Sequence, residues 1–458
     1  MPTFHLTSFG CRASQADGVA LKRQLRDAGF AEAEDPAHSD VAVLNTCTVT
    51  GTADSEVRQV IRRIHRQNPR CRILVTGCYA QRAPEEIAAL DGVAWVLGNS
   101  HKHRVAEVLR SGLPGAEHPE VLPLDPPGEI PAKVMVGEIS PEFHFAPAFP
   151  DDRTRPTLKV QDGCDARCAF CIIPAVRGPS RSLSPAEVIG EVQDLERRGA
   201  REIVLSGINL GSYGRDLSRS ITFLGLLERI LNETAIARLR ISSIEPMDVT
   251  PELIRLVARE ARLADHFHVP LQSGSDRILR LMNRRYWTRQ YAERILAIRE
   301  SLPQGGIGAD VMVGFPGETT EDHRGSADFI EGLPFTYLHI FPYSARPGTP
   351  AASRPSQVDG RLAHERGAEL RAIIARKRQA FLESQVGSTL PALTLADGLG
   401  RGDSNAPANP APGSRTALTS NYLPVSIESA NLPPNVLVDL QIGRLSGGVL
   451  HGFAARAV

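Results

Sequence analysis

The sequence contains no long apolar run. No stretch approaches the roughly 20 consecutive apolar residues that a membrane-spanning helix needs. The first ten residues, MPTFHLTSFG, also lack the basic and apolar segments of an export signal. These absences predict a cytoplasmic protein that does not bind membranes. The formal net charge is zero, so any binding of nucleic acid must depend on local patches rather than on overall charge.

The chain is long for a single hydrophobic core. Its 458 residues predict roughly two to four domains, and 42% hydrophobic and 23% charged residues are typical of a soluble globular protein. The seven cysteines are few and odd in number. In a reducing compartment, this favours metal-binding or catalytic cysteines over disulfides.

Short apolar runs alternate with helical patterns over residues 1–125 and predict an open α/β domain. Three predicted strands are each followed by a cysteine, and functional groups gather at the carboxyl ends of strands in such sheets. The three cysteines can therefore converge. The strands span residues 4–10, 40–45 and 72–77, and the cysteines are Cys11, Cys47 and Cys78.

A proline-rich segment, residues 126–153, is predicted to be a linker. From 154 to 386 a strand followed by a helix repeats six times, which predicts a parallel sheet closed into a partial (β/α)6 barrel. Ser184, Thr250 and Thr320 are predicted helix N-caps, the first within a capping box. The predicted strands are 157–160, 203–206, 238–241, 267–269, 308–313 and 337–341.

The last region, residues 387–458, changes character. Short strands separated by turn-rich segments, notably 396–415, predict a small all-β barrel. The predicted strands are 390–395, 416–419, 423–427 and 435–442.

Three cysteines lie within residues 163–172, which read GCDARCAFCI. Cys164, Cys168 and Cys171 follow the first predicted barrel strand, on the catalytic face of a β/α barrel. Thiolates are the ligands of iron–sulfur clusters, which usually take four of them. Three thiolates leave one iron open, and a small molecule such as S-adenosylmethionine (SAM) can chelate that iron through its amino and carboxylate groups. A zinc knuckle is the alternative, but no fourth cysteine or histidine lies nearby.

This cysteine spacing resembles the signature of the radical-SAM superfamily. Cys11, Cys47 and Cys78 suggest a second cluster with an open iron, and the combination resembles the methylthiotransferase family. Cys71 fits neither triad and is interpreted as a structural or surface thiol. Further resembling stretches are 9–12, 45–50, 76–81, 205–214, 268–276, 310–319 and 341–350, and residues 387–458 resemble the RNA-holding TRAM domain.

The resemblance implies two [4Fe-4S] clusters and SAM as cofactors. One SAM would donate its methyl to a sulfur on the N-terminal cluster, and a second, at the Cys164 triad, would yield the 5′-deoxyadenosyl radical that enables insertion of the methylthio group. The closest branch acts on C2 of N6-threonylcarbamoyladenosine at position 37 of tRNA. The partners would be the tRNA anticodon stem-loop and a low-potential electron donor such as flavodoxin or ferredoxin, with a monomer as the default.

Loops after the predicted barrel strands are candidates for contacting SAM. Tight-turn formation or helix capping is an alternative role for the loop 314–318. The loop at Asn209 lacks the acidic residue that many radical-SAM enzymes carry there. The candidate residues are Gly207, Asn209, Gln272, Ser273, Gly314, Pro316 and Gly317.

Arginines supply the candidate RNA contacts. One helix carries an arginine-rich face, with a solvated face as the alternative, and 284–289 mixes arginines with two aromatics, with inward packing as the alternative. Arg177 and Arg181 could meet a carboxylate or a phosphate. Glu245 could face substrate or pair with an arginine. The candidates are Arg58, Arg62, Arg63, Arg66, Arg177, Arg181, Glu245, Arg284 and Arg285.

Other functions remain open from the sequence. Within the resembled family, the substrate could instead be isopentenyladenosine in tRNA or an aspartate of a ribosomal protein. A non-enzymatic RNA-binding iron–sulfur protein is a further alternative.

Overall fold

The computed structural model describes residues 1–112, 132–141, 154–396, 415–427 and 432–457. Contacts divide the chain into two units. The first comprises Met1–Phe149, Gln161–Leu183 and Ser344–Ala352, and the second comprises Pro150–Val160, Ser184–Tyr343 and Ser353–Val458. Both cysteine triads therefore belong to the first unit. Within the described ranges, every helix is too short or too polar to cross a lipid bilayer.

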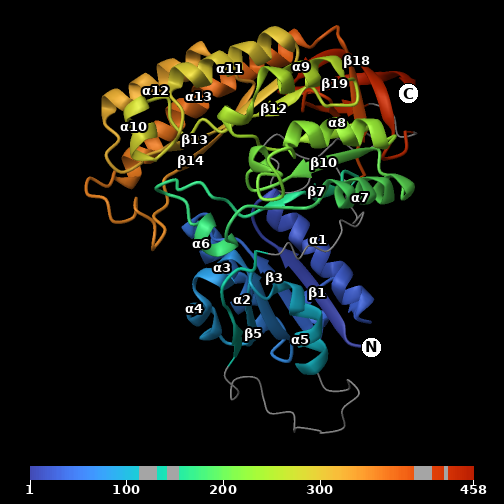
Figure 1. Cartoon of the computed structure of the whole chain (residues 1–458), viewed down its shortest axis with the longest axis vertical. Helices are drawn as coiled ribbons and strands as arrows, with labels where there is room; N and C mark the ends of the chain where they lie inside the picture. Colours follow the sequence, from blue (N-terminus) through green and yellow to red (C-terminus); the bar gives the residue numbers. More distant parts are fainter. Residues whose placement is uncertain (113–131, 142–153, 397–414, 428–431, 458) are drawn as a thin grey trace. The chain divides into compact units, whose positions relative to one another are not determined.

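A parallel six-stranded sheet forms the centre of the first unit (Figure 1). The strand order is β2-β1-β3-β4-β5-β6, and the three predicted strands of this domain are β1, β3 and β4. β6 lies within the predicted linker. Residues 133–135 of that segment are therefore not a linker but an edge strand of the sheet. The rest of that linker up to 131 and from 142 lies outside the described residues. The strands are β1 (Thr3–Ser8), β2 (Ala31–Glu32), β3 (Val41–Thr46), β4 (Arg72–Gly77), β5 (Val93–Gly98) and β6 (Lys133–Met135).

Helices cover both faces of this sheet. Val57, Ile61 and Ile64 of α2 pack on one face together with α3 and α4. Leu21 and Leu25 of α1 pack on the other face with α5. The helices of this unit are α1 (Arg12–Asp27), α2 (Gly51–Gln67), α3 (Cys78–Arg82), α4 (Pro84–Ala88), α5 (Val105–Gly112) and α6 (Ile173–Arg177), with 3-10 turns η1 (Pro36–His38) and η2 (Lys102–Arg104) and a two-stranded sheet of β8 (Gln161–Asp162) and β9 (Arg181–Ser182).

The second unit contains the predicted partial barrel. Two parallel three-stranded sheets, β11-β10-β7 and β12-β13-β14, are linked by backbone bridges from Leu239 to Leu263 and from Ser243 to His268. All six predicted strands are confirmed. They are β7 (Thr157–Lys159), β10 (Glu202–Ser206), β11 (Arg238–Ile241), β12 (His266–His268), β13 (Gly306–Val313) and β14 (Tyr337–Pro342).

The helix starts largely follow the sequence signals. Ser184 forms the predicted capping box with Glu187, and Thr250 caps the helix that follows it. The prediction for Thr320 is wrong by one residue, because Thr319 accepts from the backbone N–H of Asp322 and Thr320 is already helical. The helices are α7 (Pro185–Arg197), α8 (Phe223–Glu233), α9 (Pro251–Arg259), α10 (Asp276–Leu281), α11 (Thr288–Ser301), α12 (Thr320–Gly332) and α13 (Gly360–Ser384), with η3 (Leu210–Ser212) and η4 (Pro246–Asp248).

The C-terminal part of the second unit is a closed five-stranded barrel, in the order β15-β16-β17-β19-β18. Four strands were predicted, and the fifth, β19, follows a two-glycine turn. Most of the predicted turn region 396–415 lies outside the described residues. The strands are β15 (Thr389–Thr394), β16 (Arg415–Thr419), β17 (Pro424–Ile427), β18 (Leu437–Ser446) and β19 (Val449–Ala457).

A buried ionic cluster joins this barrel to the rest of the second unit. Glu202 of β10 is fully buried and accepts from Arg238 Nε at 2.6 Å and from Arg240 Nε at 2.8 Å. Arg240 in turn donates to the carbonyls of Ser420 at 2.8 Å and Thr419 at 3.0 Å. The paired charges thus satisfy one another and the barrel backbone, as buried ions require.

Candidate functional site

Three cysteines follow three neighbouring strands of the N-terminal sheet. Cys11 precedes α1 after β1, Cys47 directly follows β3, and Cys78 opens α3 after β4. Because β1, β3 and β4 are adjacent and parallel, their carboxyl ends lie along one edge of the sheet. The convergence that the strand ends predicted is therefore present in the backbone arrangement.

The thiols of this triad are close enough to interact electrostatically. Burial, together with the neighbouring thiols Cys11 and Cys78, raises the pKa of Cys47 to about 12. Gly10, with a φ of 90°, permits the close approach, because a Cβ at this position would lie 2.6 Å from the Cys47 sulfur. Cys11 is exposed, whereas Cys47 and Cys78 are buried. The triad thus reaches the solvent at Cys11.

The second triad lies on a loop closed at its base by β8 and β9. The backbone N–H of Cys164 donates to Gly178 at 3.0 Å, and that of Cys171 donates to Cys168 at 3.1 Å. All three thiols are partly exposed. After the last cysteine, Ile172 and Val176 pack against Cys78, so this loop contacts the first triad within the same unit.

Arg177 links the surroundings of the two triads. Its Nη1 donates to both carboxylate oxygens of Asp162, at 2.9 and 3.1 Å, just before Cys164. Its Nη2 donates to Asp17 at 3.0 Å and to Ser14 at 3.2 Å on α1. Both carboxylates that Arg177 meets belong to the protein itself, so its predicted contact with the carboxylate or phosphate of a ligand stays a prediction.

The charge of Arg177 also faces the first triad. Burial opposes the charge, but Asp162, Cys78, Asp17 and Cys11 raise the pKa of this guanidinium well above its usual value. The hydroxyl of Ser14 lies 3.7 Å from the sulfur of Cys11 and extends the network to the thiols. A buried, permanently charged arginine lowers the cost of forming thiolates beside it.

The donor sets fit iron–sulfur clusters. A thiol with a pKa near 12, such as Cys47, stays protonated at neutral pH unless a metal displaces the proton. Each triad offers three sulfur donors, and the buried Arg177 offsets part of the negative charge that a bound cluster and its thiolates would carry. Cys71 is different: it is 1% exposed, lies in the core beside Ser39, and burial raises its pKa.

The predicted SAM contacts lie after β10, β12 and β13 of the second unit. Gln272 has a φ of 65°, unusual for a residue with a side chain, and its buried Oε1 accepts no hydrogen bond from the described residues. Such strain together with an unsatisfied polar atom is typical of ligand sites. Gly314 and Gly317 also have positive φ values, 73° and 87°, and the hydroxyl of Ser273 lies 3.4 Å from that of Ser326. The remaining predicted residues of these loops are Gly207, Asn209 and Pro316.

Glu245 pairs with Arg284, the second of the two roles that the sequence left open. Burial raises the pKa of Glu245, and Arg284 opposes the shift. Of the two aromatics beside Arg285, Tyr286 packs inward and donates to the Leu271 carbonyl at 2.7 Å, whereas Trp287 is 47% exposed.

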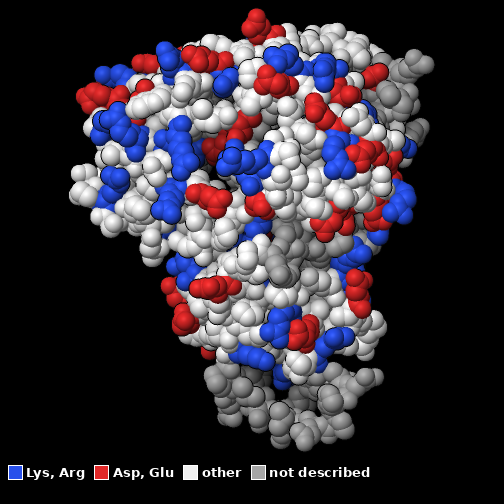
Figure 2. Space-filling model, viewed as in Figure 1, with Lys and Arg blue, Asp and Glu red and all other residues white. Residues whose placement is uncertain are grey.

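Some of the other predicted RNA contacts already form hydrogen bonds within the protein, and others are exposed. Arg58 donates to the Tyr79 hydroxyl at 2.7 Å, and Arg181 donates to the Ser140 carbonyl at 2.7 Å. Basic and acidic side chains are interspersed over the face drawn in Figure 2. The exposed arginines among the predicted set are Arg62, Arg63, Arg66 and Arg285.

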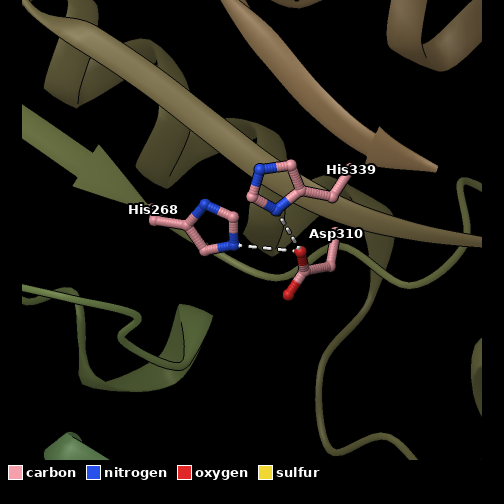
Figure 3. A group of neighbouring side chains, drawn as sticks. All are labelled: His268, Asp310 and His339. Atoms are coloured by element: carbon pink, nitrogen blue, oxygen red, sulfur yellow. Dashed lines mark hydrogen bonds and ion pairs between the residues drawn. The ribbon is translucent and has the colours of Figure 1, made fainter. Parts of the chain in front are cut away.

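One polar cluster was not predicted from the sequence. His268, Asp310 and His339 place their nitrogen and oxygen atoms within 4.8 Å of one another (Figure 3). They come from three different strands, β12, β13 and β14. The sequence feature that could have revealed this cluster is a polar residue in each of three otherwise apolar predicted strands.

Sequence comparison finds known families in two parts of the chain. Residues 3–98 match an uncharacterised protein family, UPF0004, and residues 158–330 match the Radical SAM superfamily. The chain is 39% identical over 395 residues to threonylcarbamoyladenosine tRNA methylthiotransferase MtaB of Bacillus subtilis (strain 168), covering 85% of both chains.

Two further relatives span most of their own length as well. The protein of the same name from Aquifex aeolicus (strain VF5) is 37% identical, over 85% of this chain and 92% of the relative. A tRNA-2-methylthio-N(6)-dimethylallyladenosine synthase from Pelotomaculum thermopropionicum is 33% identical, over 85% of this chain and 86% of the relative.

Proposed function

Because the chain belongs to the radical-SAM methylthiotransferase family, we propose that it adds a methylthio group to C2 of N6-threonylcarbamoyladenosine at position 37 of tRNA. The substrate assignment is supported by two relatives, at 39% and 37% identity, whose names include threonylcarbamoyladenosine. Two relatives named for dimethylallyladenosine are less similar than these, at 35% and 33% identity.

Membership of the radical-SAM superfamily implies a [4Fe-4S] cluster and SAM. We assign that cluster to Cys164, Cys168 and Cys171, and a second one to Cys11, Cys47 and Cys78. When bound, these groups supply a 5′-deoxyadenosyl radical and a methylated sulfur. The observation that carries this assignment is the presence of two thiol triads in one structural unit, with the buried Arg177 connecting their surroundings.

The chain's own residues would bind and orient these groups. Gln272 is our strongest candidate for a SAM contact, because its buried amide oxygen accepts no hydrogen bond from the described residues and its backbone is strained. Arg177 would balance the charge of the thiolates from within the protein. The remaining proposed SAM contacts are Gly207, Asn209, Ser273, Gly314, Pro316 and Gly317.

The anticodon stem-loop of tRNA is the proposed macromolecular substrate. The exposed arginines Arg62, Arg66 and Arg285 are available for phosphates, and the five-stranded C-terminal barrel resembles an RNA-holding module. The reaction also requires a low-potential electron donor, for which flavodoxin and ferredoxin are candidates.

Nucleoside mass spectrometry of tRNA from a deletion strain tests the proposal. We expect the methylthio form of threonylcarbamoyladenosine to disappear and to return on complementation with the wild-type gene. Loss of the methylthio form of isopentenyladenosine instead would assign the chain to the other tRNA substrate. If both nucleosides persist in a strain without a second such enzyme, the proposed function is wrong.

Anaerobic reconstitution tests the enzymatic role directly. About eight irons per chain and dithionite-dependent 5′-deoxyadenosine are expected from two four-iron clusters. A single cluster without SAM cleavage would instead support a non-enzymatic RNA-binding protein.

A further inference from the structure

His268, Asp310 and His339 lie on one face of the β12-β13-β14 sheet. The register pairs His268 with Gly308, and it pairs Asp310 with His339. Because side chains alternate along a strand, Gly308 and Asp310 share a face, which is also the face of their partners. The three polar side chains therefore belong to one surface, although more than 70 residues separate the first from the last.

Gly308 makes room for a fourth member, Tyr337. A Cβ at Gly308 would lie 1.9 Å from the Tyr337 ring, so only glycine lets this ring lie over the strand. The Tyr337 hydroxyl then lies 3.0 Å from Nδ1 of His268 and 2.8 Å from Nε2 of His266. The close approach of the ring to β13 holds His268 from the side opposite Asp310.

The hydrogen bonds define the orientation of both imidazoles that face Asp310. His268 Nε2 lies 3.2 Å from Asp310 Oδ1, and His339 Nδ1 lies 3.1 Å from the same oxygen. Burial opposes ionisation of Asp310, but His268 and His339 keep the pKa of this carboxyl below its usual range. The carboxylate is thus an acceptor, and each histidine donates an N–H to it.

Each imidazole directs one ring nitrogen at Asp310 (Figure 3), and the second nitrogen of His268 lies 3.0 Å from the Tyr337 hydroxyl. The His339 side chain is 42% exposed, whereas that of His268 is 8% exposed. With Nδ1 directed at Asp310, Nε2 is the ring nitrogen of His339 that can meet a ligand, and it donates an N–H in the form of the ring that carries a proton on both nitrogens. The cluster therefore holds His339 in a fixed orientation, with Nε2 directed at a ligand.

We propose that Nε2 of His339 binds the carboxylate of the threonylcarbamoyl group of the substrate nucleoside, with Asp310 and His268 as positioning residues. This inference rests on the proposed function. A polar, partly open cluster suits a side chain that ends in a carboxylate and a hydroxyl, and it is a poor surface for an isopentenyl group, which can satisfy no donor. The cluster would thus help to select between the two tRNA nucleosides.

A binding cycle on the reconstituted holoenzyme tests this contact. The probes are two fluorescent anticodon stem-loops, one with threonylcarbamoyladenosine and one with its carboxylate converted to the methyl ester. We expect wild-type protein to bind the acid more tightly than the ester by roughly tenfold, as for a hydrogen bond to a charged group. We expect His339→Leu to lose this preference and His339→Gln, which keeps an N–H donor, to retain part of it.

The experiment distinguishes loss of the contact between His339 and the carboxylate from loss of folded protein. The acid-to-ester ratio is taken within each variant, so a loss of folded protein cancels. His364→Leu, at an exposed histidine of α13, serves as the matched control and should keep the wild-type ratio. A wild-type ratio in His339→Leu overturns the inference.

Two other results also overturn it. A wild-type ratio of one means that the carboxylate is not recognised. A stoichiometric divalent metal that wild-type protein carries in addition to its iron, and that His339→Leu loses, would mean that the cluster binds a cation instead. Neither result affects the proposed function, whereas absence of methylthiolation of the threonylcarbamoyl hairpin by wild-type enzyme would refute that function itself.

Discussion

At the scale of single residues, Arg177 is a buried charge surrounded by several partners. It is 2% exposed and bonds to two carboxylates and a serine hydroxyl from two separate segments of the chain. Removing one partner of a buried ion pair is costly because the opposite charges stay buried without compensation. Arg177 therefore stabilises the first unit and also balances the charge of the thiol triad.

We expect Arg177→Met to lower the free energy of unfolding of the first unit by about 3 kcal/mol, the lower end for a broken buried ion pair, because Asp17 keeps Lys102 at 2.9 Å and Asp162 keeps Arg181 at 3.9 Å. Arg177→Lys keeps the positive charge but loses the planar set of guanidinium donors. Its free energy of unfolding should therefore lie between those of wild type and Arg177→Met. Urea unfolding measures the loss. Arg229→Met, which removes an exposed pair with Glu233, is the control and should have little effect. Equal stabilities of wild type and Arg177→Met would contradict this role.

Cys47 and Cys71 offer a matched comparison of two buried thiols in one core. On the proposed function, Cys47→Ala should reduce reconstituted iron from about eight to about four per chain and abolish methylthio transfer, while SAM is still cleaved. Cys71→Ala should keep the full iron content, because its thiol lies beside Ser39 in the core. Iron analysis with 5′-deoxyadenosine assays distinguishes the two. Full transfer activity of Cys47→Ala would refute the second cluster.

At the scale of elements, β10 and β11 carry the ionic cluster that fastens the C-terminal barrel. Burial alone would raise the pKa of Glu202, but Arg238, Arg240 and Arg155 together hold it well below its ordinary value. Since the folded pKa is the lower one, the ionised carboxylate contributes stability above the unfolded value of about 4.3. This contribution is lost as the pH falls through the folded pKa.

Glu202→Gln should therefore cost about 3–5 kcal/mol at neutral pH, since it leaves two buried arginines without their carboxylate. The stability difference from wild type should shrink as the pH falls below about 4, because wild-type Glu202 loses its advantage there. Urea unfolding at a series of pH values measures both effects. A difference that stayed constant into acid would show that the carboxylate's charge is not what stabilises this junction.

At the scale of the whole chain, the sequence predicted what local patterns determine. Strand positions followed from apolar runs. The grouping of Cys11, Cys47 and Cys78 followed from three predicted strand ends, and that of Cys164, Cys168 and Cys171 from their close spacing after one predicted strand. Asp17 and His339 could not be found in this way. Asp17 meets Arg177 from 160 positions away, and His339 meets Asp310 only through the register of β13 and β14. The cap at Thr319 rather than Thr320 was missed because two adjacent threonines give the same signal.

The last prediction concerns the independence of the C-terminal barrel, which the sequence presented as a separate domain. In the structure the barrel backbone accepts from a buried side chain, because Arg240 donates to the carbonyls of Thr419 and Ser420. In the other direction, the Asn421 side chain of the barrel donates to the Gln304 carbonyl at 2.8 Å. A chain ending at residue 386 would leave Arg240 without these acceptors, and unsatisfied buried charges are costly.

We therefore expect the truncated chain to unfold at a markedly lower temperature than the full chain, in addition to any loss of tRNA binding. Calorimetry compares the two, with Phe453→Ala as the control. Phe453 is 60% exposed on β19, and changes at such a position usually alter stability by less than about 0.5 kcal/mol. A truncated chain as stable as the full one would mean that the barrel is a removable appendage and that solvent satisfies Arg240 equally well.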